Sequence, residues 1–242
     1  MHRIVSTFRR AARAAVPAVA ALAAFAIVAP GPLVDGPSLI GKAWAQAKTK
    51  AAAPAKGPTI TSAEATKFIT DMGNRTVSIL SQQGDAKARN DAFTAIMLEA
   101  MDFESMALQT LGKMARTVSP KDKREFTQLF AAYVIDVAIE KFGSTNVARF
   151  AIGQLKPQPN GDIKVNTAVS TAEKPLSVDW RVHNKAGKPS INDVEVDGYS
   201  LVIHYRGEFE RAGVSNVPGL IGKLKSLTSH SKALPVVRTA MK

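Results

Sequence analysis

The 242-residue chain combines 32 Lys and Arg with 20 Asp and Glu, giving a formal net charge of +12, and it contains no cysteine. The absence of cysteine excludes disulfides, a thiol nucleophile and thiolate metal sites. The positive charge favours anionic lipid headgroups or an acidic partner, unless it serves only to keep the protein soluble, since Lys and Arg are spread along the chain.

Residues 1–45 have the composition of a secretory signal. Four arginines lie within the first 13 residues, a mostly apolar run follows at residues 14–29, and Ala43-Trp44-Ala45 supplies small residues for cleavage after Ala45. The apolar run is shorter than the ~20 residues that span a bilayer, so a retained anchor is the weaker interpretation. We therefore expect an exported protein that has no nucleic-acid partner.

Residues 46–60 are mainly Ala, Lys and Pro and predict a flexible leader. Residues 61–228 are expected to form a single domain, and its first half shows apolar residues at helical spacing in four segments. The first helix is capped by Thr61 or Ser62. The clearest helix is capped by Ser119, begins at Pro120 and ends at Gly143.

The period of the pattern then changes to that of β-strands. Four strand-like runs occupy residues 147–197, and residues 176–183 alternate strictly between apolar and polar. The short turns between them predict an antiparallel four-stranded meander with one apolar and one wet face. Helical spacing returns after Gly198 in two further helices, and residues 229–242 predict a polar C-terminal tail. The expected fold class is α+β, with helices packed on the apolar face of the sheet.

Ser200 is the strongest candidate for catalytic chemistry. It lies in Gly198-Tyr199-Ser200-Leu201-Val202, which has Val202 where a nucleophile elbow requires its second glycine. The preceding strands also predict an antiparallel sheet, whereas such elbows belong to parallel sheets. We predict that the Ser200 hydroxyl caps a helix or stabilises a turn, and an exported serine hydrolase remains the alternative function.

No metal or cofactor site is predicted. His183, His204 and His230 are the histidines after residue 45, and none is paired at a metal-binding spacing. The three acidic residues of one strand, Asp193, Glu195 and Asp197, alternate with valines and are explained as the wet face of the sheet. Phosphate-binding glycine motifs are absent as well, so no cofactor is expected.

Two stretches resemble a known family. "FESMALQTLGKMARTVSPKDKREFTQLFAAYV" and "DVEVDGYSLVIHYRGEF" are similar to the MlaC family, the periplasmic lipid carriers of the Mla (toluene-tolerance) pathway, and the resemblance spans residues 60–227. It implies a non-enzymatic periplasmic protein that takes lipid between an outer-membrane lipoprotein complex and an inner-membrane ABC transporter complex. Some relatives are associated with hopanoid biosynthesis, so phospholipid and hopanoid-type lipids are both candidate ligands.

The sequence departs from the family pattern at two places. Pro189-Ser190-Ile191 stands where the family usually has Trp-Lys-Val, and "YVIDVAIEKF" lacks the usual Thr-Tyr pair. These differences leave the identity of the lipid open.

A lipid carrier needs an apolar slot between its sheet and its helices. The expected lining comprises nine residues of both walls: Tyr133, Val137, Val178, Trp180, Val182, Val194, Val196, Leu201 and Tyr205. The alternative is that the two walls fill each other completely, as in a structural interaction domain with a closed core.

Overall fold

The computed structural model describes residues 59–242 except 83, 143–148, 171–174 and 215. The expected secretory signal and nearly all of the expected leader lie outside these residues, as does Gly143. No helix in the described ranges is both long and apolar enough to cross a bilayer.

The first half of the domain is helical, as predicted. It comprises α2 (Ser62–Leu80), α3 (Ala86–Ala100), α4 (Phe103–Leu111), the short 3-10 helix η2 (Gly112–Arg116) and α5 (Pro120–Phe142). Thr61 caps α2 in a reciprocal arrangement, in which the Glu64 amide donates to the Thr61 hydroxyl and the Thr61 amide donates to the Glu64 carboxylate. Ser119 accepts a hydrogen bond from the Asp122 amide at the start of α5.

The sheet has five antiparallel strands instead of the four predicted. In spatial and sequence order these are β1 (Arg149–Pro157), β2 (Ile163–Ser170), β3 (Pro175–Lys185), β4 (Lys188–Val196) and β5 (Tyr199–Ser200). The extra strand is two residues long and pairs with the end of β4. It forms because Asp197 and Gly198 both have positive φ, which produces a two-residue hairpin turn.

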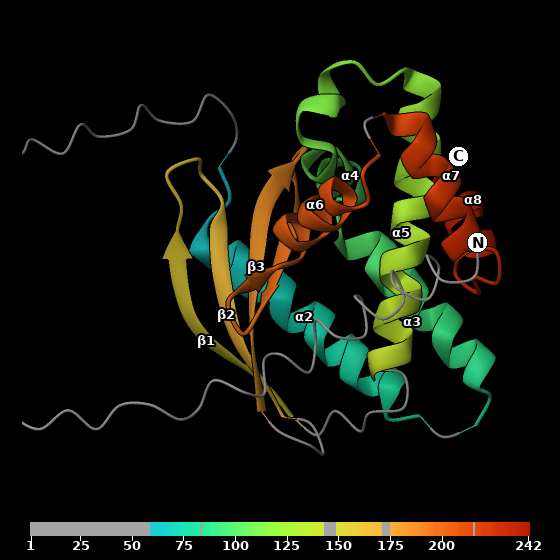
Figure 1. Cartoon of the computed structure of the whole chain (residues 1–242). Helices are drawn as coiled ribbons and strands as arrows, with labels where there is room; N and C mark the ends of the chain where they lie inside the picture. The colour runs from blue at the N-terminus through green and yellow to red at the C-terminus, as the bar shows by residue number, and fades with distance from the viewer. Residues whose placement is uncertain (1–58, 83, 143–148, 171–174, 215) are drawn as a thin grey trace, which may run out of the picture. The chain divides into compact units, whose positions relative to one another are not determined.

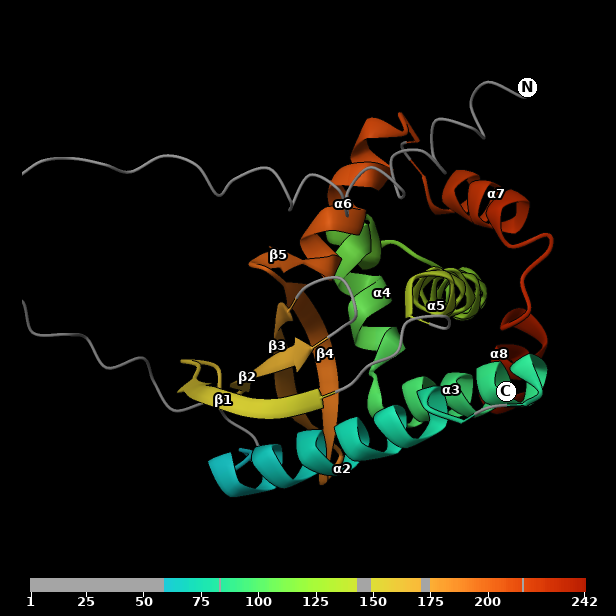
Figure 2. The same ribbon diagram turned by 90° about the horizontal axis from the view of Figure 1, so that it is seen from below.

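Helix α2 covers the apolar face of the sheet and crosses the strands in Figure 2. At Gly73, an added Cβ would lie 2.5 Å from Cε1 of Phe150 on β1. Glycine at this position therefore lets the helix approach the sheet closely.

The second half ends in three helices, α6 (Leu201–Arg211), α7 (Val217–Leu227) and α8 (Leu234–Ala240). The α7 and α8 helices pack on α5, on the side away from the sheet (Figures 1 and 2). The prediction of a polar tail at residues 229–242 is therefore wrong for α8. Val237 is fully buried there, and Gln128 donates a hydrogen bond to the Met241 carbonyl at 3.0 Å.

A buried carboxylate joins the helices to the β3–β4 hairpin. Asp102 caps α4 by accepting from the Ser105 amide, and it lies 2.6 Å from Lys185 Nζ and 3.2 Å from His183 Nε2. Its own amide donates to the Ile191 carbonyl at 2.7 Å. Burial alone would raise the pKa of Asp102, but the contacts from His183, Lys185 and Ser105 outweigh it and hold that pKa well below its usual range. The carboxylate is therefore charged at neutral pH.

We predict that Asp102→Asn lowers the free energy of unfolding at pH 7 by about 1–3 kcal/mol, because Lys185 and the α4 amide lose a charged acceptor. The lowered pKa makes this contribution present above about pH 4 and progressively lost as the pH falls below that value. Urea unfolding at pH 7 and pH 3 measures it. Asp91→Asn, which breaks the exposed pair with Lys87, is the control and should cost less than about 0.5 kcal/mol. Equal losses for the two variants would contradict the prediction.

Candidate functional site

Five of the nine expected slot-lining residues lie side by side on the apolar face of the sheet. Val178 pairs with Val196, Trp180 pairs with Val194, and Val182 follows on the same face of β3. Val178, Val182 and Val194 are buried, whereas Trp180 and Val196 are half-buried. The indole of Trp180 donates to the Thr167 hydroxyl at 2.9 Å, which fixes the orientation of the ring.

The other four expected residues lie on α5 and α6. The rings of Tyr133 and Tyr205 meet edge to face with centroids 5.7 Å apart, and both are buried. Val137, one turn after Tyr133, and Leu201, the first residue of α6, are half-buried. Burial strongly raises the pKa of Tyr205, so its phenol stays protonated.

The tyrosine pair belongs to a wider aromatic cluster that holds α6 on α5. Tyr205 contacts Phe130 at 5.5 Å and Phe209 at 6.3 Å between ring centroids, and Phe126 contacts Phe209 at 5.8 Å. The main contacts between helices and sheet come from α2, α3, α4 and α6, while α5 packs mainly on α4, α7 and α8. Thus α6 connects the helical layer around α5 to the β4 edge of the sheet.

The apolar face of the sheet is buried unevenly. At one end, Ile163 of β2 pairs with Val182 of β3, and both are buried. At the other end, Val169 pairs with Leu176, and both are half-buried. Val196 of β4 is also half-buried. The face is therefore closed at its Ile163 end and incompletely covered at its Val169 end.

An apolar cluster continues from that end of the sheet onto three helices. Leu80 of α2 and Phe93 of α3 are its buried members, and the residues packed against them remain partly exposed: Val77, Ile79, Met97, Ala138, Ile139 and Val169. We call these residues, with Leu176 and Val196, the apolar wall. Apart from Val196, none of them is among the nine residues that the sequence predicts for the slot lining. The unbroken apolar run of residues 137–139 on α5 and the continued alternation to Val169 were the available signals.

The corner between β4 and α6 is organised by Asp193. Its carboxylate accepts hydrogen bonds from the Ser200 hydroxyl at 2.6 Å, the Val202 amide at 3.2 Å and the Val194 amide at 2.9 Å. The prediction that Asp193 belongs to a wet face is wrong, because α6 packs over this part of β4 and leaves only 3% of the residue exposed. Glu195 does carry an ion pair on the opposite face from the apolar wall, with Lys164.

Ser200 is the N-cap of α6, as the sequence predicted. Its oxygen accepts from the Ile203 amide at 3.1 Å while its proton goes to Asp193. A nucleophilic serine instead needs its proton on a general base such as histidine, held in turn by a third group. The hydrogen bonds of the hydroxyl thus serve the corner, which favours the capping role over the hydrolase alternative.

A second hydrogen-bonded group fixes α6 to α4. Arg206 donates from both Nε and Nη2 to the backbone carbonyl of Gln109, and the side-chain Nε2 of Gln109 donates to the Asn192 carbonyl of β4 at 3.3 Å. Helix α6, which carries Leu201 and Tyr205, is therefore held by hydrogen bonds at its start and at its middle.

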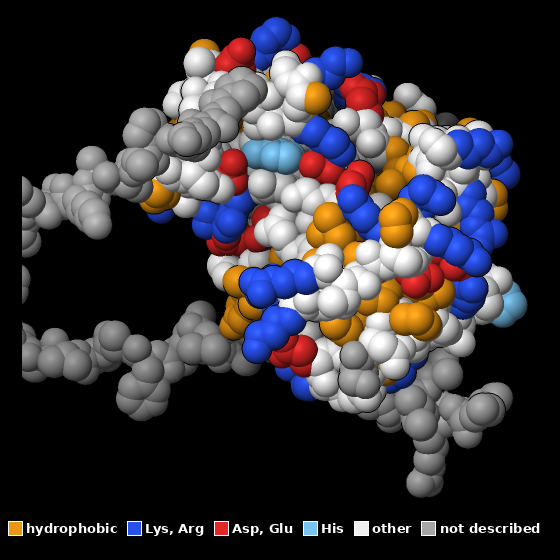
Figure 3. Space-filling model, turned by 90° about the horizontal axis from the view of Figure 1, so that it is seen from above, with side chains coloured by type: hydrophobic (Ala, Val, Ile, Leu, Met, Phe, Trp, Pro, Cys, Tyr) orange, Lys and Arg blue, Asp and Glu red, His pale blue; other side chains and the backbone are white. Residues whose placement is uncertain are grey.

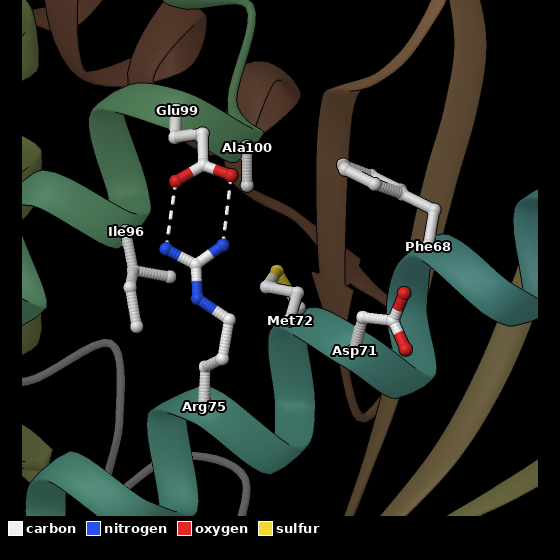
Figure 4. Close-up of a pocket in the computed structure, with 7 residues that line it drawn as sticks. All are labelled: Phe68, Asp71, Met72, Arg75, Ile96, Glu99 and Ala100. Carbon is white, nitrogen blue, oxygen red and sulfur yellow. Dashed lines mark hydrogen bonds and ion pairs between the residues drawn. The ribbon is translucent and has the colours of Figure 1, made fainter.

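A small hollow lies between α2 and α3 (Figure 4). Its volume is about 160 Å³, and Phe68, Met72, Ile96 and Ala100 line it beside a double hydrogen bond between Arg75 and Glu99. Ligand pockets usually measure roughly 300–1,000 Å³, so this hollow is too small for a lipid. In the described ranges, no three His, Cys, Asp or Glu side chains gather where they could hold a metal ion.

Comparisons with known proteins agree with this architecture. A phospholipid-binding protein from Ralstonia solanacearum, solved in complex with a phospholipid, matches with a TM-score of 0.62 and 14% sequence identity. The match covers 69% of this chain and 98% of that one, and it supports a shared fold. No curated protein matches the chain. Residues 70–226 match the family model described as "MlaC protein". Because this match spans more than half of the chain and confirms the resemblance noted in the sequence, the chain belongs to the MlaC family.

Proposed function

We propose that the protein is a periplasmic, non-enzymatic carrier that holds the acyl chains of a phospholipid against the apolar wall and leaves the headgroup toward solvent. The observation that carries this proposal is the incomplete burial of Val169, Leu176 and Val196, although they lie on the inner face of a sheet flanked by helices. A closed core would bury these side chains. The phospholipid bound by the Ralstonia solanacearum protein of similar fold supports the choice of ligand.

The physical reason for such a carrier is the cost of exposing acyl chains to water. Each methylene withdrawn from water is worth about 0.8 kcal/mol, so a free phospholipid hardly ever crosses an aqueous compartment as a monomer. An apolar surface within a folded domain replaces the membrane for the chains and requires no chemistry. The partners in this proposal are an outer-membrane lipoprotein complex and an inner-membrane ABC transporter complex, as the family resemblance implies.

The fixed position of α6 suits this function. Helix α6, which carries Leu201 and Tyr205, is fixed to β4 by the Asp193 hydrogen bonds and to α4 by the Arg206 hydrogen bonds. Release then requires a partner that offers the lipid a better site or shifts the protein to a state that binds it less well.

The function is tested by purifying the processed protein natively, extracting it with organic solvent and identifying the extract by mass spectrometry. We expect about one phospholipid per protein. A hopanoid-type lipid at the same ratio would support the carrier function and identify the ligand as a hopanoid-type lipid instead of a phospholipid. Protein that carries no lipid and takes none up from phospholipid vesicles would contradict the carrier.

Val169→Asp should reduce the retained lipid at least fivefold, because an unpaired carboxylate in contact with acyl chains costs several kcal/mol. The matched control is Ala168→Asp, since Ala168 is the exposed neighbour whose side chain points to the opposite face of the sheet. Mass spectrometry of natively purified variants measures the lipid, and circular dichroism verifies folding. If a folded Val169→Asp variant retains as much lipid as Ala168→Asp, Val169 does not contact the ligand.

Trp180 offers a direct optical readout, since it is the sole tryptophan after residue 45. Its half-buried ring lies on the same face as the apolar wall. We expect delipidated protein to show a blue shift of its emission when phospholipid is added, because the lipid removes water from the ring. Trp180→Phe should bind the lipid and lose the signal. An unchanged spectrum in protein that mass spectrometry finds loaded would remove Trp180 from the binding surface.

A further inference from the structure

The positive charge of the domain is concentrated at its C-terminal end. Residues 59–210 contain 18 Lys and Arg and 19 Asp and Glu, so they are close to neutral. Residues 211–242 contain six Lys and Arg and no acidic side chain. The excess within the folded domain therefore comes from the segment that contains α7 and α8, although basic residues as such occur along the whole chain.

This segment forms one side of the molecule. Both helices lie on α5, on the side away from the sheet (Figures 1 and 2). Figure 3, viewed from above, shows Lys and Arg side chains gathered along the edge where Figure 1 places these helices. We call the outer surface of α7, α8 and the loop between them the basic face.

Part of this charge has no carboxylate partner. Arg211 pairs with Glu208, and Lys225 pairs with Glu125 of α5. Lys232 and Arg238 are exposed, and within the described part of the chain no carboxylate forms an ion pair with either of them. These side chains are therefore available to an anionic partner.

The chemistry of the basic face distinguishes between two classes of partner. Protein interfaces depend on apolar and aromatic anchors at their centre. Among the residues that the structure describes, the large exposed hydrophobic side chains are Tyr199 (62%) and Ile203 (68%), which lie on β5 and α6. The exposed positions of α7 are Pro218, Gly222, Lys225 and Ser226. Cations without an apolar anchor fit a lipid surface, where charge is spread over many headgroups.

We propose that the basic face adsorbs the protein to membranes that contain anionic phospholipids. Such adsorption is electrostatic and reversible, because nothing on this face inserts into the acyl region. This adsorption goes beyond the carrier function. It concerns the side of the domain away from the sheet, whereas the apolar wall includes residues of the sheet.

Co-sedimentation of the processed, lipid-loaded protein with vesicles tests the proposal. We expect binding to phosphatidylcholine vesicles that contain about 30% phosphatidylglycerol and no binding to pure phosphatidylcholine vesicles. Raising the salt from about 0.05 M to about 0.5 M should release the protein, because salt shortens the range of the electrostatic attraction. Lys232→Glu/Arg238→Glu should lower the partition coefficient at least tenfold.

The matched control is Lys156→Glu/Lys188→Glu, which makes the same change in net charge at exposed positions of β1 and β4. It should lower the partition coefficient less than threefold. Equal losses in the two variants would mean that net charge alone acts, and would overturn the proposal. Binding that is independent of headgroup or salt would also overturn it.

If the unaltered protein fails to bind the anionic vesicles, the proposal is wrong and the basic face is assigned to an acidic protein partner. The lipid carried by each variant, measured by mass spectrometry, keeps this result separate from the carrier function. A variant that loses vesicle binding and retains its lipid supports the proposal, whereas loss of the carried lipid in the unaltered protein bears on the carrier function alone.

Discussion

The buried carboxylate of Asp193 is the interaction on which the arrangement of sheet and helices depends. It lies on β4 and accepts the hydroxyl of Ser200 and the amide of Val202, so one acidic group closes the β4–β5 turn and starts α6. From that start, α6 carries Leu201 at the border of the sheet and Tyr205 into the aromatic cluster of α5. A buried carboxylate is tolerated because three donors satisfy it. The direction in which α6 leaves the sheet follows from this corner.

In the proposed function the same sheet serves both stability and lipid binding, at different ends of it. Buried pairs such as Ile163 with Val182 form ordinary core, while Val169 and Leu176 stay half-buried. Each square ångström of apolar surface left uncovered forgoes roughly 25 cal/mol of stabilisation. The domain offsets this loss with closely packed helices, as at Gly73 against Phe150 and in the ring cluster around Tyr205. The fully buried core and the half-buried residues at the Val169 end of the sheet thus lie in different parts of the same domain.

Much of this architecture could be predicted from the sequence, because it depends on local rules. Caps at Thr61 and Ser119, alternation in β3 and helical spacing after Ser200 are set by neighbouring residues, and each is confirmed. The errors concern tertiary contacts. Asp193 reads as a surface residue because nothing in the alternation of β4 indicates that α6 will cover it. Residues 229–242 look polar because Val237 meets its apolar neighbours only through packing on α5. Likewise, the packing of helices on the sheet decides which apolar residues stay half-buried. The alternation of β2 predicts the same burial for Val165 and Val169, although only Val165 is fully buried.

In the two proposed functions the protein binds lipid and also leaves membranes, and the separation of charge from apolar surface fits both demands. The apolar wall lies between the sheet and the helices, whereas the unpaired cations lie on the side of α5 away from the sheet. A carrier whose membrane contact was itself apolar would be held by the same force that holds its lipid, and one bilayer would retain it. Electrostatic adsorption weakens within a Debye length, which is about 10 Å at 0.1 M salt. A protein that combines the two proposed functions can therefore leave a membrane without giving up the interactions that retain its lipid.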